Sequence, residues 1–391
     1  MHNPHKHSPD SIKALSATQT PAYVADMAAI KRNLATAARI KSEAGVQILL
    51  ATKAFAMFSV FPYMREALDG TTASGAYEAR LGSTHFGKEV HTYSPAFTEE
   101  ALLETLEYSN HIYFNSINQL EKFSNLVREK RADAKIGLRV NPGLSLVKNS
   151  ALYDPSSPCS RFGVSHEDIT YNILEKIDIL HFHNLCENMA EDSCALIDHI
   201  SSKFAAALKR VKYVNLGGGH YINHPNYDIS KLINHLKKFK QDFDINVILE
   251  PGGALVYDAG YLVTTVMDIF TRPDGSHHAI IDGSASTHMP DVLEVPYRPH
   301  IIGSFEGGEK SHTYLLGGNT CMTGDVIGSY SFDAPLTVGQ RLIFTDMMQY
   351  SFVKNTTFNG VPLPDLGILH EDGRYELVKR FGYRDFETRL S

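Results

Sequence analysis

Short apolar runs alternate with helical patterns along the first 250 residues. Eight of these runs end at polar or small residues, namely Lys53, Ser74, Ser94, Asn115, Asn141, His183, Gly217 and Glu250. The helical patterns between them cover residues 60–68, 77–86, 98–108, 117–130, 166–177, 190–209 and 229–239. Thr98 and Ser116 stand where helix N-caps are expected. Strands that alternate with helices predict parallel βαβ units, and eight of them predict a closed (β/α)8 barrel of the α/β class. An open doubly wound sheet is the alternative, but no G-x-G-x-x-G turn follows any of the strands.

The pattern changes near residue 260. Shorter β-rich runs cover residues 261–270, 278–282, 313–316 and 341–345, and turn residues such as Pro273-Asp-Gly275 separate them. These runs predict a C-terminal β domain over residues 261–391, after a barrel over residues 20–260. A short early strand at about residues 20–26 is a candidate member of this β domain. Residues 1–19 are predicted to be a mobile tail, and we interpret its histidines His2, His5 and His7 as part of that tail rather than as a metal site.

Composition limits the classes of function. A chain of 391 residues suits one barrel plus a smaller domain, and 43% hydrophobic residues exclude global disorder. The net charge of -7 argues against a nucleic-acid surface and is compatible with a cationic substrate. Four cysteines without a CxxC pair indicate a reducing compartment. The first twenty residues show no apolar signal-peptide core and no run of membrane length occurs, so we expect a cytoplasmic protein.

Lys53 is the first candidate for chemistry. The carboxyl ends of all eight barrel strands face the same end of a barrel, and Lys53 follows the buried strand that begins at Val46. An unpaired ammonium is costly to bury, so this lysine is paired, extends to solvent or is used chemically. A lysine amine in such a place can form a Schiff base with pyridoxal 5'-phosphate.

Three other strand ends offer what this cofactor needs. The triplet Gly217-Gly-Gly219 allows backbone N–H groups to approach a phosphate, although a plain tight turn explains it equally well. His183 can stack on a flat ring, or it is a satisfied core histidine. Glu250 can hold a pyridine nitrogen protonated, which makes the ring an electron sink, or it is a paired structural carboxylate.

The joint pattern resembles a known family. Ala51-Thr-Lys53-Ala, His181-Phe-His183, Gly217-Gly-Gly219 and Glu250-Pro-Gly252 are similar in order and spacing to the motifs of the alanine-racemase-fold pyridoxal-phosphate decarboxylases. That family includes ornithine, arginine and diaminopimelate decarboxylases, and the similarity runs from residue 20 to about residue 358. Further segments resemble the carboxynorspermidine and carboxyspermidine decarboxylase branch, at residues 181–187, 282–290, 318–325 and 345–351.

The resemblance implies roles around the cofactor. Lys53 is similar to the Schiff-base lysine, and His183 to the histidine that stacks on the ring. The phosphate is expected at Gly218, Gly219 and Tyr350, and the pyridine nitrogen at Glu250. No metal is expected.

The resemblance also implies a head-to-tail homodimer with shared sites. Cys321 is similar to a cysteine that the partner subunit donates and that helps to protonate the carbanion. Asp325 resembles the acidic residue that receives the distal amine of the substrate. Glu187, Asp291 and Glu250 are the other candidates for substrate binding.

Three departures from the larger decarboxylases argue against ornithine decarboxylase itself. Gly253 stands where an arginine is common, Thr71 where an aspartate is common, and Cys186 where a serine is common. The implied reaction is the decarboxylation of carboxynorspermidine to norspermidine, or of carboxyspermidine to spermidine, in polyamine biosynthesis. The alternatives are a diaminopimelate or other basic amino-acid decarboxylase, a racemase, which Glu250 disfavours, and a non-catalytic pyridoxal-phosphate-binding regulator.

Overall fold

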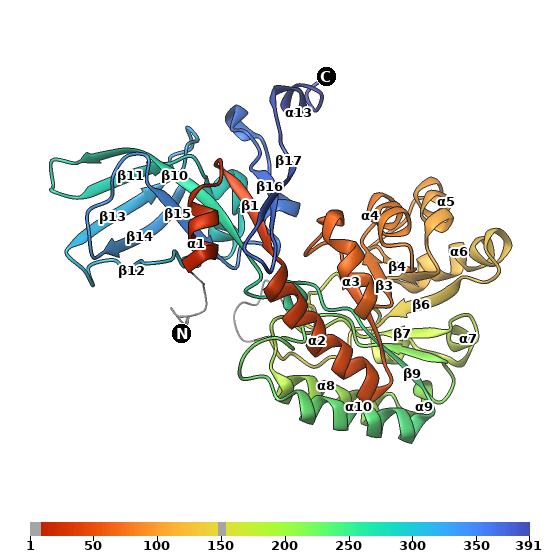
Figure 1. Ribbon diagram of the computed structural model, residues 1–391. Coiled ribbons are helices and arrows are strands. Elements are labelled where there is room, and N and C mark those ends of the chain that lie inside the picture. The colour runs from red at the N-terminus through yellow and green to blue at the C-terminus, as the bar shows by residue number, and fades with distance from the viewer. Residues whose placement is uncertain (1–8, 148–153) are drawn as a thin grey trace. The chain divides into compact units, whose positions relative to one another are not determined.

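The computed structural model describes residues 9–147 and 154–391 (Figure 1). The histidine-rich tract at residues 2–7 lies outside the described residues. The chain forms two compact units, one of residues 32–255 and one made of the segments before and after it. The sequence had placed the division at residue 260. The two compact units divide after residue 255, and the strand that begins at Gly260 pairs with the early strand at residues 22–26.

The first unit is the predicted closed barrel. Its eight strands pair in parallel in chain order, and the pairing of Gln47 with Ile248 closes the ring. The strands are β2 (Gln47–Ala51), β3 (Gly70–Ala73), β4 (Glu89–Tyr93), β5 (His111–Phe114), β6 (Lys135–Arg139), β7 (Ile179–His181), β8 (Tyr213–Asn215) and β9 (Asn246–Leu249). Each predicted strand end therefore follows one of these strands within a few residues, and the open-sheet alternative is wrong.

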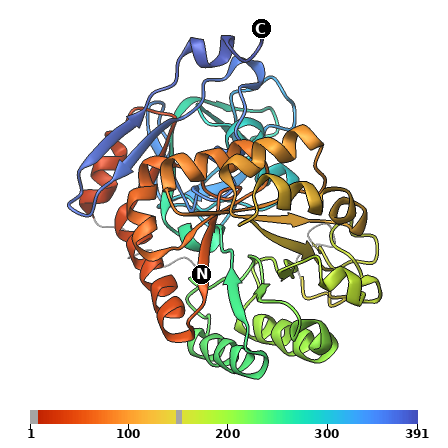
Figure 2. The same cartoon turned by 90° about the vertical axis from the view of Figure 1, so that its right-hand side faces the viewer.

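Helices surround the barrel strands, as Figures 1 and 2 show. They are α2 (Met27–Ala44), α3 (Phe61–Ala67), α4 (Ala76–Leu81), α5 (Glu99–Tyr108), α6 (Ile117–Lys130), α7 (Tyr171–Leu174), α8 (Ala190–Lys203), α9 (Ala205–Leu208) and α10 (Ile229–Phe243). The predicted caps are confirmed, since the side chains of Thr98 and Ser116 accept hydrogen bonds from backbone N–H groups one turn into α5 and α6. Helices α8 and α10 lie side by side on the outside of the barrel.

One predicted helix is much shorter than its pattern. Residues 166–177 form a single turn at His166–Asp168 and then the four-residue helix α7. Thr170 has extended backbone angles between them, with φ of -84° and ψ of 168°, so the helical hydrogen bonds cannot continue.

The second unit is built on a nine-stranded sheet in the order β12-β14-β13-β11-β10-β1-β16-β17, with β15 also paired to β10. Its strands are β1 (Ala22–Asp26), β10 (Gly260–Thr271), β11 (His277–Ile281), β12 (Phe305–Glu306), β13 (His312–Gly317), β14 (Val326–Phe332), β15 (Arg341–Thr345), β16 (Asp365–Leu369) and β17 (Tyr375–Lys379). The short helices of this unit are α1 (Pro9–Ser16), α11 (Ala285–His288), α12 (Asp291–Glu294) and α13 (Tyr383–Glu387). Strand β1 lies inside this sheet, between β10 and β16.

Part of the predicted mobile tail is ordered. Residues 9–16 form α1, and Leu15 is buried in an apolar cluster with Val24, Val263 and Ile343. Removing a leucine side chain from water is worth about 2 kcal/mol, which offsets only a small part of the entropy lost by ordering the helix, at about 1–2 kcal/mol per residue. The prediction missed this helix because its apolar face is narrow and meets its partners only in the folded sheet.

Candidate active site

Lys53 follows β2 by two residues, in a turn where Ala54 and Phe55 donate backbone hydrogen bonds to the carbonyl of Ala51. Its side chain is exposed to solvent, but the barrel atoms around its amine lower its pKa. Burial is the main cause, and the Arg139 charge adds to it, while Glu250 acts in the opposite direction. A lowered pKa raises the fraction of neutral amine, which is the nucleophilic form.

The glycine triplet after β8 packs directly against the end of β7. Gly217 and Gly219 have φ of 67° and 85°, a conformation that other residues rarely adopt. A Cβ atom on Gly219 would lie 2.1 Å from the carbonyl oxygen of Leu185, and one on Gly217 would lie 2.6 Å from the side chain of His183. Both positions therefore require glycine. The N–H of Gly219 has no hydrogen-bond partner among the described residues, and it is available to a phosphate.

His183 is oriented by this turn. Its Nδ1 accepts a hydrogen bond from the N–H of Gly218 at 3.0 Å, which leaves the other ring nitrogen to carry the proton. Burial, together with the Lys53 and Arg139 charges, holds the pKa of His183 well below its ordinary value. The ring is therefore neutral and fixed in place, as a stacking support for a flat cofactor needs to be.

Glu250 follows β9 directly and is only 4% exposed. Its Oε1 accepts a hydrogen bond from Asn215 Nδ2 at 2.7 Å, and its Oε2 lies 3.5 Å from His181 Nε2. Burial raises the pKa of Glu250, but the neighbouring His181 and the donor Asn215 outweigh it and lower the pKa to about 2. The carboxylate is therefore ionised at neutral pH, which is the state that pairs with a protonated pyridine nitrogen.

Sequence reasoning missed Arg139, the last residue of β6. Its guanidinium donates to the carbonyl of His183 at 2.9 Å and lies over the rings of Tyr93 and Phe162, at 4.6 and 4.3 Å. It supplies a fixed positive charge beside Lys53. The signal was present, since Arg139 is a cation at the end of a buried strand, as Lys53 is.

Glu78 was missed as well. Its Oε2 accepts hydrogen bonds from the Thr52 hydroxyl at 2.9 Å and from the N–H of Ser74 at 2.7 Å. It thus ties the segment that carries Lys53 to the end of β3. No motif pointed to it, because Glu78 lies within α4 and meets Thr52 only in the folded barrel.

Glu187 and Cys186 lie just beyond His183. Glu187 is exposed and has a φ of 53°, and the N–H of Cys186 donates to Asn188 Oδ1 at 2.8 Å. Burial raises the pKa of the Cys186 thiol, and the Glu187 charge adds to this. The exposed carboxylate of Glu187 remains a candidate for binding a cationic substrate.

The other predicted residues lie in the β unit, where the carboxylate of Asp325 already has partners within its own chain. Asp325 is 4% exposed, and five donors of the surrounding turn already occupy its two oxygens. These donors are neutral hydroxyl and backbone N–H groups of Ser284, Ala285, Ser286 and Thr320. These hydrogen bonds organise the turn around Asp325, and its role toward a substrate amine stays a prediction.

Asp291 is also already paired, since its carboxylate and that of Glu294 contact the ammonium of Lys354. One ammonium neutralises only one of these two carboxylates, so a net charge of -1 remains and the role of Asp291 toward a substrate amine stays a prediction. Tyr350 follows β15 with a φ of 51°. Cys321 has an exposed thiol, and its N–H donates to Asn359 Oδ1 at 2.8 Å. The roles of Tyr350 and Cys321 stay predictions.

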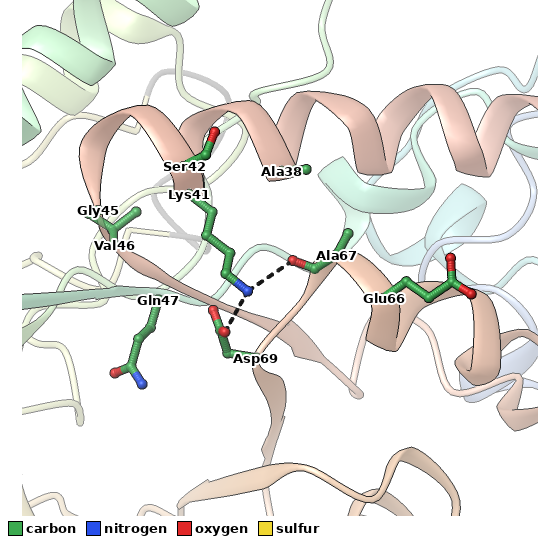
Figure 3. Close-up of a pocket in the computed structure, with 9 residues that line it drawn as sticks. All are labelled: Ala38, Lys41, Ser42, Gly45, Val46, Gln47, Glu66, Ala67 and Asp69. Atoms are coloured by element: carbon green, nitrogen blue, oxygen red, sulfur yellow. Dashed lines mark hydrogen bonds and ion pairs between the residues drawn. The ribbon is translucent and has the colours of Figure 1, made fainter.

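The described barrel contains a depression of about 450 Å3 that is separate from these residues (Figure 3). Its lining belongs to α2, to the start of β2 and to the segment before β3, at the amino end of the barrel strands. Lys41 reaches across it to Asp69 at 2.6 Å and so neutralises its main charges. The depression offers no reactive group.

His181, His183 and Glu250 also have donor atoms that lie within 4.8 Å of one another, a spacing that a metal ion requires. The lone pairs that would bind the ion are partly used, because His183 Nδ1 accepts from Gly218 and Glu250 Oε1 accepts from Asn215. A neutral ring, an ionised carboxylate, a glycine turn and a lysine with a lowered pKa fit pyridoxal phosphate better.

Comparisons with known proteins agree with this geometry. A family model described as "Pyridoxal-dependent decarboxylase, C-terminal sheet domain" matches residues 22–348. A carboxyaminopropylagmatine decarboxylase of Synechocystis is 40% identical, over 96% of this chain and 96% of its own. A carboxynorspermidine/carboxyspermidine decarboxylase of Campylobacter jejuni is 37% identical, over 95% of this chain and 98% of its own.

A solved structure is also similar along the whole chain. The crystal structure of carboxynorspermidine decarboxylase from Campylobacter jejuni, complexed with norspermidine, has a TM-score of 0.88 and 36% identity, covering 95% of this chain and 100% of that one. Among the helices of residues 9–147 and 154–391, none combines the length and the apolar character that a membrane span requires.

Proposed function

The chain belongs to the family of pyridoxal-dependent decarboxylases, and from this premise we propose that it removes the α-carboxylate of a carboxylated polyamine. The substrates are carboxynorspermidine, which gives norspermidine, and carboxyspermidine, which gives spermidine. The observation that carries the proposal is the ionised Glu250 at the same barrel end as Lys53, in a chain whose 37% relatives are named for these two substrates.

The residues at the barrel end have distinct tasks. Lys53 would hold pyridoxal phosphate through its amine, and Gly219, with the turn around it, would receive the phosphate. His183 supports one face of the ring, and Glu250 keeps a proton on the pyridine nitrogen. When bound, pyridoxal phosphate supplies the electron sink that accepts the electron pair left behind by carbon dioxide.

Reprotonation of the substrate carbon is assigned to the Cys321 thiol. Cys321 is exposed in the single chain and lies in the β unit, which is compatible with donation to the site of a second subunit. We therefore propose a head-to-tail homodimer with shared sites. A mixture of Lys53→Ala and Cys321→Ala chains tests it, because each is inactive alone and hybrid dimers regain one intact site. No recovery after mixing and reassembly contradicts the shared site.

The cellular location is proposed to be the cytoplasm. All four cysteines are free, as expected for a protein in a reducing compartment. Fractionation of the producing cells, with a known cytoplasmic protein as the marker, tests this.

A second candidate substrate is carboxyaminopropylagmatine, which the 40% identical Synechocystis relative favours. It ends in a guanidinium group rather than an ammonium group, so it needs a planar, bidentate partner. Carboxynorspermidine and carboxyspermidine differ by only one methylene, worth about 1–3 kcal/mol in a pocket.

The deciding experiment is a panel of substrates scored for carbon dioxide release. It contains the three carboxylated polyamines, diaminopimelate, ornithine and arginine. We expect turnover of carboxynorspermidine and carboxyspermidine and none of the three amino acids. Exclusive turnover of diaminopimelate rejects the polyamine proposal, and racemisation without carbon dioxide release rejects decarboxylation.

A further inference from the structure

Asn215, the last residue of β8, uses every hydrogen-bonding group of its side chain. Its Nδ2 donates to Glu250 Oε1 at 2.7 Å and to the hydroxyl of Tyr113 at 3.1 Å, and its Oδ1 accepts from the N–H of Gly217 at 2.8 Å. The side chain is fully buried. A single amide group therefore connects the carboxylate assigned to the pyridine nitrogen with the first residue of the turn assigned to the phosphate.

The chemistry of these partners sets the direction of the amide. The N–H of Gly217 can only donate, so it requires the oxygen of Asn215. The ionised carboxylate of Glu250 can only accept, so it requires the nitrogen. A rotation of the amide by 180° would place two acceptors and two donors in contact, which burial makes costly. The orientation is determined without ambiguity.

Tyr113 supports the amide from behind. Its buried hydroxyl accepts a hydrogen bond from the second Asn215 N–H. The same hydroxyl lies 3.2 Å from His91 Nδ1 and can donate a hydrogen bond to it. His91 Nε2 in turn lies 3.3 Å from Glu89 Oε2. Each group in this chain of hydrogen bonds can therefore donate to the next one, from Asn215 through Tyr113 and His91 to Glu89 at the start of β4.

Asn215 is also the one side chain of the described residues that has hydrogen-bond geometry to the Glu250 carboxylate. His181 is the other polar neighbour, at 3.5 Å, but neither of its ring nitrogens has a hydrogen-bond partner within the described chain. The direction in which Glu250 points therefore depends on Asn215.

We propose that Asn215 is a positioning residue for the cofactor, which holds the Glu250 carboxylate and the glycine turn in one fixed relation, with Tyr113 fixing its amide. The inference rests on the proposed function, since it concerns pyridoxal phosphate at this site. It predicts that one substitution weakens cofactor binding and also changes the protonation of the ring nitrogen. A residue with a purely structural role would not affect the ring nitrogen.

The test uses the full-length chain with Asn215→Leu, which keeps the shape of the side chain and removes both donors and the acceptor. Two quantities are measured after reconstitution: the affinity for pyridoxal phosphate, by equilibrium dialysis, and the protonation of its ring nitrogen, by NMR of 15N-labelled cofactor. Losing a hydrogen bond to a charged partner corresponds to roughly a 10- to 100-fold weaker affinity, with the ring nitrogen partly deprotonated. Tyr113→Phe is expected to change both quantities in the same direction but less.

The matched control is Asn33→Leu, in which a buried asparagine of the same unit, bonded to the carbonyl of Leu255, is replaced. It should leave the ring nitrogen protonated. In a Glu250→Gln background, Asn215→Leu should not change the ring nitrogen further, because its route of action is already absent.

Asn215→Asp covers the case in which Asn215→Leu does not fold. Aspartate has the same shape and keeps the acceptor for Gly217, but it places a second carboxylate against Glu250, so the two acids share a proton. The pair still carries a net negative charge, so the ring nitrogen should keep its proton, but Glu250 loses the donor that orients it and the affinity for pyridoxal phosphate should fall. The proposal is overturned if a folded Asn215 variant binds the cofactor as the parent does with a protonated ring nitrogen, or if neither variant folds, which makes Asn215 purely structural. A parent chain that binds no pyridoxal phosphate rejects the proposed function instead.

Discussion

Replacing Glu250 with glutamine should destabilise the cofactor-free chain at neutral pH. Glutamine has nearly the same shape, and its amide oxygen can still accept the hydrogen bond from Asn215. The substitution therefore removes the charge and little else, and it resembles the protonated form of Glu250. Any change in the free energy of unfolding then reports how strongly the surrounding barrel favours the ionised carboxylate.

The magnitude follows from the pKa of Glu250. Burial raises this pKa, but the neighbouring His181 and the donor Asn215 lower it overall, from an ordinary 4.5 to about 2. At about 1.4 kcal/mol per pKa unit, the folded barrel favours the carboxylate by about 3 kcal/mol. Because the folded-state pKa is depressed, this stability is fully present above pH 4.5 and is lost as the pH falls through about 2.

The assay is urea denaturation of the cofactor-free parent and of Glu250→Gln, at pH 7 and at pH 4. The chain contains no tryptophan, so circular dichroism is the appropriate probe. We expect the variant to lose about 3 kcal/mol at pH 7, and less at pH 4. Glu121→Gln is the control, since Glu121 forms an exposed pair with Lys176 in the same unit and should cost about 0.5 kcal/mol or less.

Two results would refute the reasoning. A Glu250→Gln chain as stable as the parent at pH 7 means that His181 and Asn215 do not compensate for burying the charge. A difference that grows as the pH falls means that the folded-state pKa of Glu250 is raised rather than lowered, and the proposed pairing with a protonated pyridine nitrogen then loses its basis.

Three further predictions concern other residues. Lys53→Ala should remove the absorption band near 420 nm, roughly where pyridoxal phosphate joined to lysine absorbs, together with carbon dioxide release, and a band that survives would place the covalent link elsewhere. Gly219→Ala should destabilise the chain clearly more than Gly275→Ala does. Both glycines have φ near 85°, but only Gly219 lies against a neighbouring carbonyl. Equal melting temperatures of the two variants would contradict that close approach. Asp325→Asn should lower the melting temperature, because the new amide NH2 group faces donors that the carboxylate oxygens now accept from. Asp291→Asn weakens a partly exposed ion pair and should cost only about 1 kcal/mol or less. If Asp325→Asn instead raises KM without lowering the melting temperature, Asp325 binds the substrate.

Local patterns in the sequence were enough to predict the barrel and its reactive end. Each barrel strand is a short apolar run that ends at a polar or small residue. Because the strands are parallel, these residues all lie at the same end of the barrel. Lys53, His183 and Glu250 could be selected for that reason before any contact was known. The β unit was predicted less completely, because β12, β14, β16 and β17 lie between turns and carry weaker alternation. The pairing of β1 with β10, more than 200 residues later, does not appear in either segment alone.

What only the tertiary structure decided is which polar groups are already satisfied. Asp325 and Asp291 were expected to bind substrate amines, and within this chain a turn contacts the first and a lysine contacts the second. In the sequence Asn215 is an uncharged residue before the glycine turn and Arg139 is a cation at a strand end. Only the barrel register sets Asn215 against Glu250 and Arg139 against the carbonyl of His183. The sequence determines which groups reach the carboxyl end of the barrel, because strand polarity is local. Their partners depend on closure of the ring, because a hydrogen bond forms only between atoms that folding brings within about 3 Å.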